Sequence, residues 1–328
     1  MATGLIYSDR FLDHKTAPGH PERVDRLIAI VDKLKATHQW DEVTHLPFKT
    51  ADLRWIEALH HPRYIKQLFE ACRSGKTTLD EHEGGLCPDS ADIAQLAVGG
   101  ALAAVDAVLD ATVHNALCLL RPPGHHAEAD RSMGFCYFNN AAIAANYLIE
   151  HHKLERIVVI DWDVHHGNGT QHLTEHRRDI YCINLHQHPM TLYPGTGYAH
   201  EKGTADAVGY TLNLPLDPHA DDERYRKVWL EHLEPAVRNY NPDFIIISAG
   251  FDAAQGDPLA HMNVTPEGFR WMTRQTKQLA EDLCDGRLVS MLEGGYDLQS
   301  LAENVAIHLR ALMREEQQDG LMAMKAGF

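Results

Sequence analysis

The segment DWDVHH, residues 161–166, places two carboxylates and two imidazoles directly after an apolar β-branched run, Ile157–Ile160. That run predicts a buried strand. In an extended chain, residues two apart point the same way, so Asp161, Asp163 and His165 are expected to line one face. Buried carboxylates need a cation or an imidazolium beside them. The pattern predicts half of a metal site, and a turn of polar residues that caps a strand is the alternative.

Three further segments place a candidate functional side chain shortly after an apolar run. These side chains are the pair His125 and His126, then Asp252, then Tyr296. Taken singly, the pair could be a surface feature, Asp252 a helix N-cap and Tyr296 a half-buried tyrosine. Because parallel strands deliver functional groups at their carboxyl ends, we expect all of them at one edge of a sheet.

Asp163, His165 and Asp252 would supply three ligands and leave one coordination position open, as in a catalytic zinc site. The metal would polarise a carbonyl and lower the pKa of a bound water from about 15.7 toward about 7. An adjacent histidine could move that proton, and Tyr296 could donate to the developing oxyanion. The set predicts hydrolysis of an amide or related carbonyl bond. Because two ligands are carboxylates, Fe²⁺ or Mn²⁺ could compete with Zn²⁺.

The segments that must position these residues alternate between strand-like and helix-like patterns, which predicts an α/β fold with a mostly parallel central sheet and helices on both faces. The expected strands are Ala116–Leu120, Ile157–Asp161, Ile180–Leu185, Phe244–Ser248 and Leu288–Leu292. The expected helices are Glu22–Lys35, Ala51–Leu59, Ser90–Leu109, Asn139–His151, Asp222–Tyr240 and Thr265–Cys284. We expect one catalytic domain over residues 1–314 and a polar tail over residues 315–328.

Composition narrows the class of protein. The chain has 328 residues, 44% of them apolar, and a formal net charge of −16, which argues against a nucleic-acid partner. We expect no membrane-spanning segment, and residues 1–7 turn polar too soon for a signal peptide. The six scattered cysteines show no CxxC spacing and are expected to be free thiols in a reducing cytoplasm. Nothing in the sequence indicates the oligomeric state.

Taken together, the motifs resemble those of the histone deacetylase family, the zinc-dependent acetyl-lysine amidohydrolases. The matching strings occur in order over nearly the whole chain: HKTAPGHPER, RPPGHHAE, GFCYFNN, DWDVHHGNGT, YPGTG, SAGFDAAQGDPL and LEGGYD. The pattern is most similar to the class II branch and its bacterial relatives, because Asn168 stands where class I enzymes carry an aspartate.

The resemblance assigns roles to the residues of these motifs. Asp163, His165 and Asp252 would bind zinc. His126 would be the main general base and acid, with Asn168 as its partner, and His125 would pair with Asp161. Tyr296 would complete the oxyanion pocket. Because Asn168 is neutral, His126 should be somewhat less basic than in class I enzymes.

The resemblance also implies a narrow tunnel for the stem of acyl-lysine, and a second cation. The tunnel would be lined by Gly134, Phe135, Tyr193 and Leu259, with Tyr193 in place of the common phenylalanine. A potassium ion would lie beside Asp161, near the backbone of Asp163 and His165, at a site that here includes Asn184 and Leu185. Arg26 resembles the arginine of the family's internal acetate channel.

Three other functions compete with an acyl-lysine hydrolase. An acetylpolyamine or other small-acylamine amidohydrolase shares these motifs, but it tends to carry an acidic rim residue where this chain has Leu259. An arginase-like ureohydrolase would need a second metal and another aspartate near Asp252, where Ala253 and Ala254 stand. A non-catalytic acyl-lysine binder would be expected to have lost Tyr296, a histidine or a ligand. The substrate would be an acetylated protein, a peptide or a small acylamine.

Overall fold

The computed structural model describes residues 2–79 and 85–313, and these form one α/β domain around an eight-stranded sheet. Every strand pair is parallel, and the strand order is β2-β1-β3-β8-β7-β4-β5-β6. The strands are β1 (Thr3–Ile6), β2 (Thr44–His45), β3 (Asn115–Cys118), β4 (Ile157–Asp161), β5 (Ile180–Gln187), β6 (Thr211–Leu216), β7 (Phe244–Ala249) and β8 (Leu288–Leu292). The predicted fold class is therefore confirmed.

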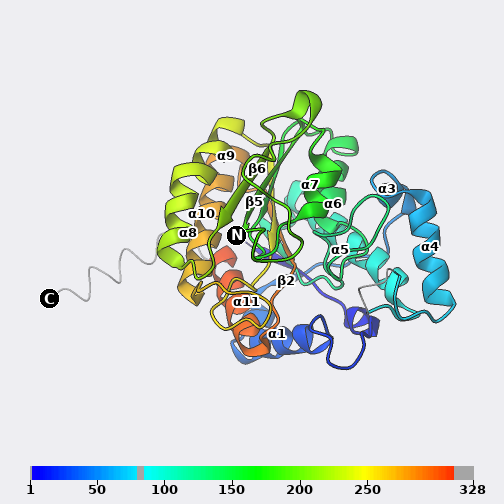
Figure 1. Ribbon diagram of the computed structural model, residues 1–328. Helices are drawn as coiled ribbons and strands as arrows, with labels where there is room; N and C mark the ends of the chain where they lie inside the picture. Colours follow the sequence, from blue (N-terminus) through cyan, green and yellow to red (C-terminus); the bar gives the residue numbers. More distant parts are fainter. Residues whose placement is uncertain (1, 80–84, 314–328) are drawn as a thin grey trace.

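Helices cover both faces of the sheet, on the left and right of Figure 1. One layer contains α1 (Asp25–Ala36), α2 (Gln39–Glu42), α8 (Asp222–Val228), α9 (Glu234–Tyr240), α10 (Pro266–Cys284) and α11 (Leu298–Met313). The other contains α3 (Leu53–Glu57), α4 (Pro62–Arg73), α5 (Ser90–Leu109), α6 (Asn140–Glu150) and α7 (Asn168–Thr174). Short helical turns complete the set: η1 (Asp9–Asp13), η2 (Ala205–Ala207) and the π-helical η3 (Trp229–Leu233).

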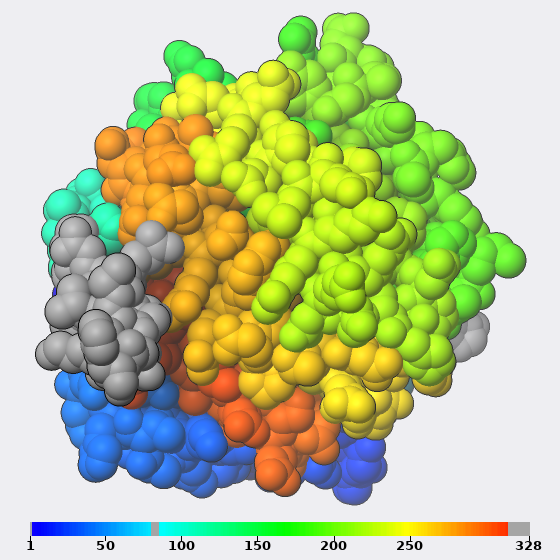
Figure 2. Space-filling model, turned by 90° about the vertical axis from the view of Figure 1, so that its left-hand side faces the viewer, coloured from blue at the N-terminus to red at the C-terminus, as the bar shows by residue number. Residues whose placement is uncertain are grey.

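The face turned to the viewer in Figure 2 belongs largely to the first layer, with α8 to α10 in yellow-green to orange above α1 in blue. The sequence predicts a single helix over Asp222–Tyr240, but the structure interrupts it with the π-helical η3. Pro235 follows this turn and has no backbone N–H to donate, which accounts for the interruption of the α-helical ladder.

Helix α5 is long and apolar enough to cross a membrane by length and composition alone, contrary to the expectation from the sequence. Most of this apolar stretch is buried inside the protein, where α5 contacts β1, β3 and α6. That placement is typical of the core helix of a folded domain. The predicted tail at residues 315–328 lies outside the described residues.

The sheet order brings four functional loops together. Strands β3, β8, β7 and β4 are consecutive neighbours in the sheet although they are far apart in the sequence. The loops that follow them carry the histidine pair, Tyr296, Asp252, and Asp163 with His165, respectively. Since all four strands run in the same direction, their carboxyl ends present these side chains at one edge.

Candidate active site

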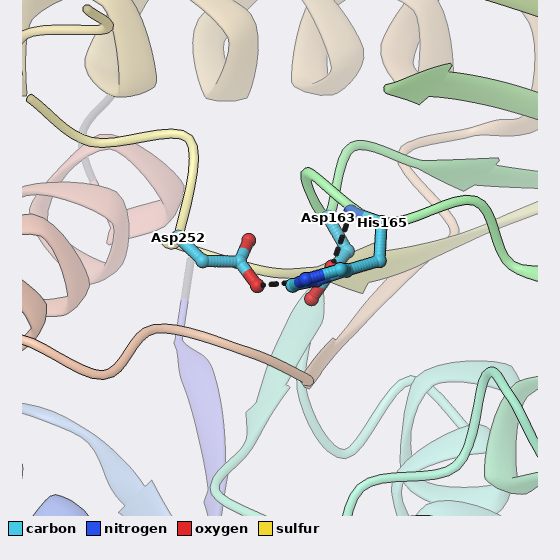
Figure 3. A group of neighbouring side chains, drawn as sticks. All are labelled: Asp163, His165 and Asp252. Atoms are coloured by element: carbon cyan, nitrogen blue, oxygen red, sulfur yellow. Dashed lines mark hydrogen bonds and ion pairs between the residues drawn. The ribbon is translucent and has the colours of Figure 1, made fainter. Parts of the chain in front are cut away.

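Asp163, His165 and Asp252 converge in the interior, as Figure 3 shows. The Nδ1 atom of His165 lies 3.0 Å from Oδ1 of Asp163 and 3.1 Å from Oδ2 of Asp252. Both carboxylates are almost completely buried, at 1% and 0% exposed. The three ligand atoms lie within 4.8 Å of one another, so the predicted ligand set is brought together.

Asp163 and His165 are positioned by a turn that follows β4, not by further strand pairing. Strand β4 ends at Asp161, whose Oδ1 accepts the backbone N–H of Asp163 at 3.0 Å. Oδ1 of Asp163 accepts the N–H of His165 at 2.9 Å in the same way. Aspartate commonly makes such local hydrogen bonds in turns. The expected extended conformation, in which residues two apart point the same way, therefore ends with strand β4 at Asp161.

The remaining carboxylate oxygens are held by backbone amides. Oδ2 of Asp163 accepts the N–H of Gly294 at 2.7 Å, and Oδ1 of Asp252 accepts the N–H of Val164 at 2.9 Å. A Cβ atom on Gly250 or Gly294 would collide with these carboxylates, which explains why the loops can approach so closely. The ligands are thus fixed in position by their surroundings.

The donor set fits a divalent cation. Burial, together with the charge of Asp163, raises the pKa of Asp252 to about 7 although His165 opposes this, so protein groups alone leave this carboxylate poorly compensated. For Asp163, burial opposes ionisation, but His125 and His165 outweigh it and lower its pKa. Two carboxylate oxygens and one imidazole nitrogen are ligands that Zn²⁺, Fe²⁺ and Mn²⁺ accept.

The two neighbouring histidines differ in charge. Nδ1 of His125 lies 2.9 Å from Oδ2 of Asp161, as predicted. Burial lowers the pKa of His125, but the charges of Asp163 and Asp161 outweigh burial and raise it well above its ordinary value. Burial, together with the charges of His125 and His165, lowers the pKa of His126 well below its ordinary value. These opposite shifts favour the imidazolium form of His125 and the neutral form of His126.

A chain of hydrogen bonds defines the tautomer of His126. Nδ2 of Asn168 donates to Glu128 at 2.8 Å. The Oδ1 atom of Asn168 is therefore the acceptor that faces Nδ1 of His126 at 2.6 Å. The Nδ1 atom of His126 therefore carries the proton, and the lone pair is on Nε2. A neutral imidazole with a free Nε2 is the form that a general base requires.

Tyr296 remains a hydrogen-bond donor. Burial raises the pKa of its phenol well above its ordinary value, and the charges of Asp252 and Asp163 add to this effect, while Arg26 opposes it. The guanidinium carbon of Arg26 lies 5.0 Å from the centre of the Tyr296 ring. The protonated phenol can therefore donate to a developing negative charge beside the ligand trio.

A pocket of about 410 Å³ leads to these groups. It is lined by His126, Gly134, Phe135, His165, Leu192, Tyr193, Leu259 and Tyr296. All four predicted tunnel residues are among them. Gly134 and Phe135 both have positive φ, at +51° and +67°, and Phe135 is the kind of backbone outlier that often accompanies a functional site. The ring centres of Phe135 and Tyr296 lie 6.1 Å apart.

The residues predicted to hold potassium lie beside the ligand trio. Asn184 pairs with Asp161 across β5 and β4. The side chain of Asn184 is buried, its Nδ2 donates to Asn213 at 2.9 Å, and its Oδ1 has no hydrogen-bond partner. Leu185 follows in β5 and is fully buried.

Several residues important to this site were not predicted from the sequence. Glu293 accepts the N–H groups of Gly124 and His125 at 2.8 and 3.2 Å, which holds the loop with the histidine pair. Burial raises its pKa to about 7, although the charge of His125 opposes this. Glu128, Leu192 and Asp257 were also missed. Glu293 stands at the end of an apolar run, the signal that identified the other residues, and it could have been found in the same way.

Comparisons with known proteins agree with this geometry. A model of the histone deacetylase domain matches residues 20–312. A probable deacetylase of Archaeoglobus fulgidus is 40% identical over 302 residues, which cover 91% of this chain and 82% of the relative. The histone deacetylase-like amidohydrolase of Pseudomonas aeruginosa is 38% identical, covering 85% of this chain and 73% of the relative. The human polyamine deacetylase HDAC10 is 36% identical, and the match covers 95% of this chain and 48% of the relative.

A solved structure, that of the HDA15 HD domain, superposes with a TM-score of 0.90 at 34% identity. The match covers 95% of this chain and 89% of the other. The fold, together with these matches, places the chain among the α/β proteins of the deacetylase and amidohydrolase class. The chain belongs to the histone deacetylase family.

Proposed function

We propose that this protein is a zinc-dependent hydrolase that removes acetyl or other acyl groups from the side-chain amine of acyl-lysine in proteins or peptides. One observation carries the proposal. His165 of the ligand trio, the base His126 and the phenol of Tyr296 line one pocket, with Asp163 and Asp252 buried beside His165. This arrangement supports attack of water on an amide carbonyl at the inner end of the pocket.

Asp163, His165 and Asp252 would hold the zinc ion, which supplies a Lewis acid for the amide carbonyl and for the attacking water. His126 accepts a proton from the water at Nε2 and later returns it to the leaving amine. The imidazolium of His125 contributes positive charge near the reacting carbonyl. The Tyr296 hydroxyl donates to the developing oxyanion, a contact worth roughly 3–4 kcal/mol.

The lining of the pocket favours a neutral acyl-lysine stem over a charged polyamine. Of the described residues that line it, none is an aspartate, glutamate, lysine or arginine. A polyamine carries ammonium groups whose desolvation in such a pocket would be costly without a carboxylate. An acetylpolyamine hydrolase remains the second candidate because a relative is named a polyamine deacetylase.

The substitution Leu259→Glu tests this choice. It introduces a carboxylate into the pocket lining, and we expect kcat/KM for acetylspermidine to rise at least tenfold relative to an acetyl-lysine peptide. Leu259→Gln is the matched control because it introduces a polar group without a charge. Wild-type protein that already prefers acetylspermidine or acetylputrescine would favour the second candidate.

Hydrolysis of a fluorogenic acetyl-lysine peptide tests the mechanism. We expect His126→Ala to lower kcat by at least about 100-fold, the lower range for general base catalysis. We expect Tyr296→Phe to lower kcat by about 100- to 1,000-fold, the usual result of removing one oxyanion donor. Full activity in both variants would disprove the assigned mechanism.

The metal and the potassium ion are tested by reconstitution. We propose zinc as the working metal, and activity after chelation and addition of Zn²⁺, Fe²⁺ or Mn²⁺ alone would identify it. The buried Oδ1 of Asn184, which lacks a hydrogen-bond partner, supports a potassium ion beside Asp161. Activity should then depend on potassium chloride more steeply than on an equal concentration of tetramethylammonium chloride.

We further propose a cytoplasmic location and no nucleic-acid partner. All six cysteines are free thiols, five of them buried, as expected in a reducing compartment. Fractionation of the source cells with an antibody to the protein would test the location.

A further inference from the structure

The side chain of Asp257 links two walls of the pocket. Asp257 lies five residues after Asp252 in the loop that follows β7, and it is buried, at 7% exposed. Its Oδ2 accepts the backbone N–H of Tyr296 at 2.7 Å and that of Asp297 at 3.3 Å. Its Oδ1 accepts the N–H of Leu259 at 3.0 Å. One carboxylate therefore joins the loop of the phenol to the loop of the hydrophobic wall.

The backbone around Tyr296 needs such a restraint. The preceding Gly295 has φ of +120°, a conformation that is open to glycine and gives the loop little rigidity of its own. From the other side, Nε of Arg26 donates to the carbonyl of Gly295 at 2.7 Å. The loop is thus held between a guanidinium on its carbonyl group and a carboxylate on its amides. Such charge-assisted hydrogen bonds are about twice as strong as neutral ones.

We propose that Asp257 is a positioning residue, which sets the place of the Tyr296 hydroxyl relative to the pocket wall at Leu259. The inference rests on the proposed function and adds to it a group that acts only through the phenol. Asp257 does not line the pocket. Its contribution to the reaction is the fixed geometry of a hydrogen-bond donor that must meet the oxyanion.

The expected effect follows from that geometry. Asp257→Ala leaves the amides of Leu259 and Tyr296 without their acceptor, so the loop with the phenol should shift or become mobile. A misplacement of about 1 Å can cost about 100-fold in rate. We expect kcat to fall by about 10- to 100-fold while KM changes by less than about threefold, because the phenol acts mainly in the transition state.

A double-mutant cycle with Asp257→Ala and Tyr296→Phe tests the proposal. In the wild-type background, Asp257→Ala should lower kcat/KM by about 10- to 100-fold. In the Tyr296→Phe background, the same change should cost less than about threefold, because the hydroxyl that it positions is already absent. An equal loss in both backgrounds would show that Asp257 acts by another route and would overturn the proposal.

A matched control separates positioning from general destabilisation. Asp243 also accepts two backbone amides, those of Glu155 and Arg156 at 3.0 and 2.9 Å, but it precedes β7 at the opposite end of the sheet. Asp243→Ala should lower the melting temperature without a selective loss of kcat. If Asp257→Ala does not fold, Asp257→Asn takes its place in the cycle, since one amide oxygen replaces two carboxylate oxygens.

Two further readouts do not depend on substrate turnover. Hydrogen exchange of residues 293–297 should become faster in Asp257→Ala, with and without added zinc, and unchanged exchange would argue against the tether. The same cycle can be measured as affinity for a hydroxamate, whose carbonyl oxygen can accept from the phenol. If wild-type protein hydrolyses no acylated amine, the proposed function fails. Hydrogen exchange and the double-mutant cycle in hydroxamate affinity then still decide whether Asp257 positions Tyr296.

Discussion

At the scale of single residues, the site depends on the unequal charge of two adjacent histidines. The charges of Asp161 and Asp163 raise the pKa of His125 and favour its doubly protonated form, while His126 hydrogen-bonds a neutral amide and its lowered pKa favours the neutral ring with one proton. In the proposed mechanism, a positive His125 keeps the base His126 neutral and also favours negative charge on the substrate. Groups whose surroundings shift their pKa values apart commonly divide acid and base roles in this way.

The pKa of His126 should respond to the charge of its partner. Asn168→Asp places a carboxylate where the amide oxygen now lies 2.6 Å from Nδ1, and the carboxylate favours the imidazolium. The base is active when neutral, so activity falls as the pH drops through its pKa. Raising that pKa moves the acid limb of the kcat/KM profile to higher pH, by about one unit or more.

The control for this experiment is Asn146→Asp, which adds the same charge beside Arg177, remote from the pocket. Its acid limb should coincide with that of the wild-type protein. An acid limb that stays in place in Asn168→Asp would show that another group limits activity at low pH.

The proposed metal ligands Asp163, His165 and Asp252 give a second prediction at this scale. Asp252→Asn keeps the size of the side chain but removes the charge that compensates a cation. We expect bound zinc, measured by elemental analysis after dialysis, to fall from about one equivalent to a small fraction of that, since even loss of an outer-shell partner costs roughly 10- to 100-fold in affinity. Asp257→Asn, which changes a neighbouring carboxylate outside the ligand trio, should retain zinc. Full zinc occupancy in Asp252→Asn would remove Asp252 from the ligand set.

At the scale of elements, the site is built from loops that short polar contacts fasten to helices. Asn139 is the N-cap of α6, and its Oδ1 accepts the N–H of Ala142 at 2.9 Å. Its Nδ2 donates to Thr170 of α7 at 3.1 Å, within reach also of the carbonyl of His125. One buried side chain therefore joins two helices and the histidine loop.

Replacement of Asn139 should lower the free energy of unfolding by more than the loss of an ordinary helix N-cap does. Asn139→Ala removes the cap, usually worth about 1 kcal/mol, and leaves buried partners unsatisfied at about 1–3 kcal/mol more. We expect urea denaturation to show a loss of about 2–4 kcal/mol. Asp52→Ala removes the exposed cap of α3, a 3.0 Å bond to the N–H of Arg54, and should cost about 1 kcal/mol or less. Equal losses in the two variants would contradict this account.

At the scale of the whole molecule, buried neutral histidines connect elements of the core. His308 of α11 lies 2.7 Å from the hydroxyl of Thr273 in α10 and 2.8 Å from that of Ser290 in β8. The Thr273 hydroxyl donates to the carbonyl of Phe269, so it accepts from Nδ1 of His308, and Ser290 donates to Nε2. The neutral ring is therefore fully satisfied, and burial lowers its pKa to about 3.

This histidine should make the protein sensitive to acid. The unfolded chain takes up a proton at a pKa of about 6.5, whereas the folded chain does so only near 3, so stability is lost as the pH falls below about 6.5. The loss from His308 between pH 7.5 and 5 is about 2 kcal/mol. His308→Gln should be less stable at pH 7.5 but should lose less stability on acidification, as measured by urea denaturation at both pH values. An unchanged dependence in His308→Gln would exclude this role.

Much of the fold could be predicted from local patterns. Strands β4 and β8 and helix α5 have the bounds expected from the sequence, because each is a mainly apolar segment bounded by polar residues. Strands β1, β2 and β6 were missed: two are very short, and the third contains Pro215, which an edge strand tolerates. Helix α11 was overlooked although Leu301, Val305, Leu309 and Leu312 recur at helical spacing.

The residue types on which the proposed chemistry depends could be found in the sequence, because the candidate ligands, the histidine pair and the tyrosine each follow an apolar run. The tertiary structure alone decided how these motifs meet, since the order β3-β8-β7-β4 differs from the order in the chain. The same three-dimensional arrangement sets which side chains hold the loops of these motifs in place. Asp257 and Glu293 act on backbone amides 39 and 169 residues away, and amides carry no side-chain signal that a sequence pattern could reveal.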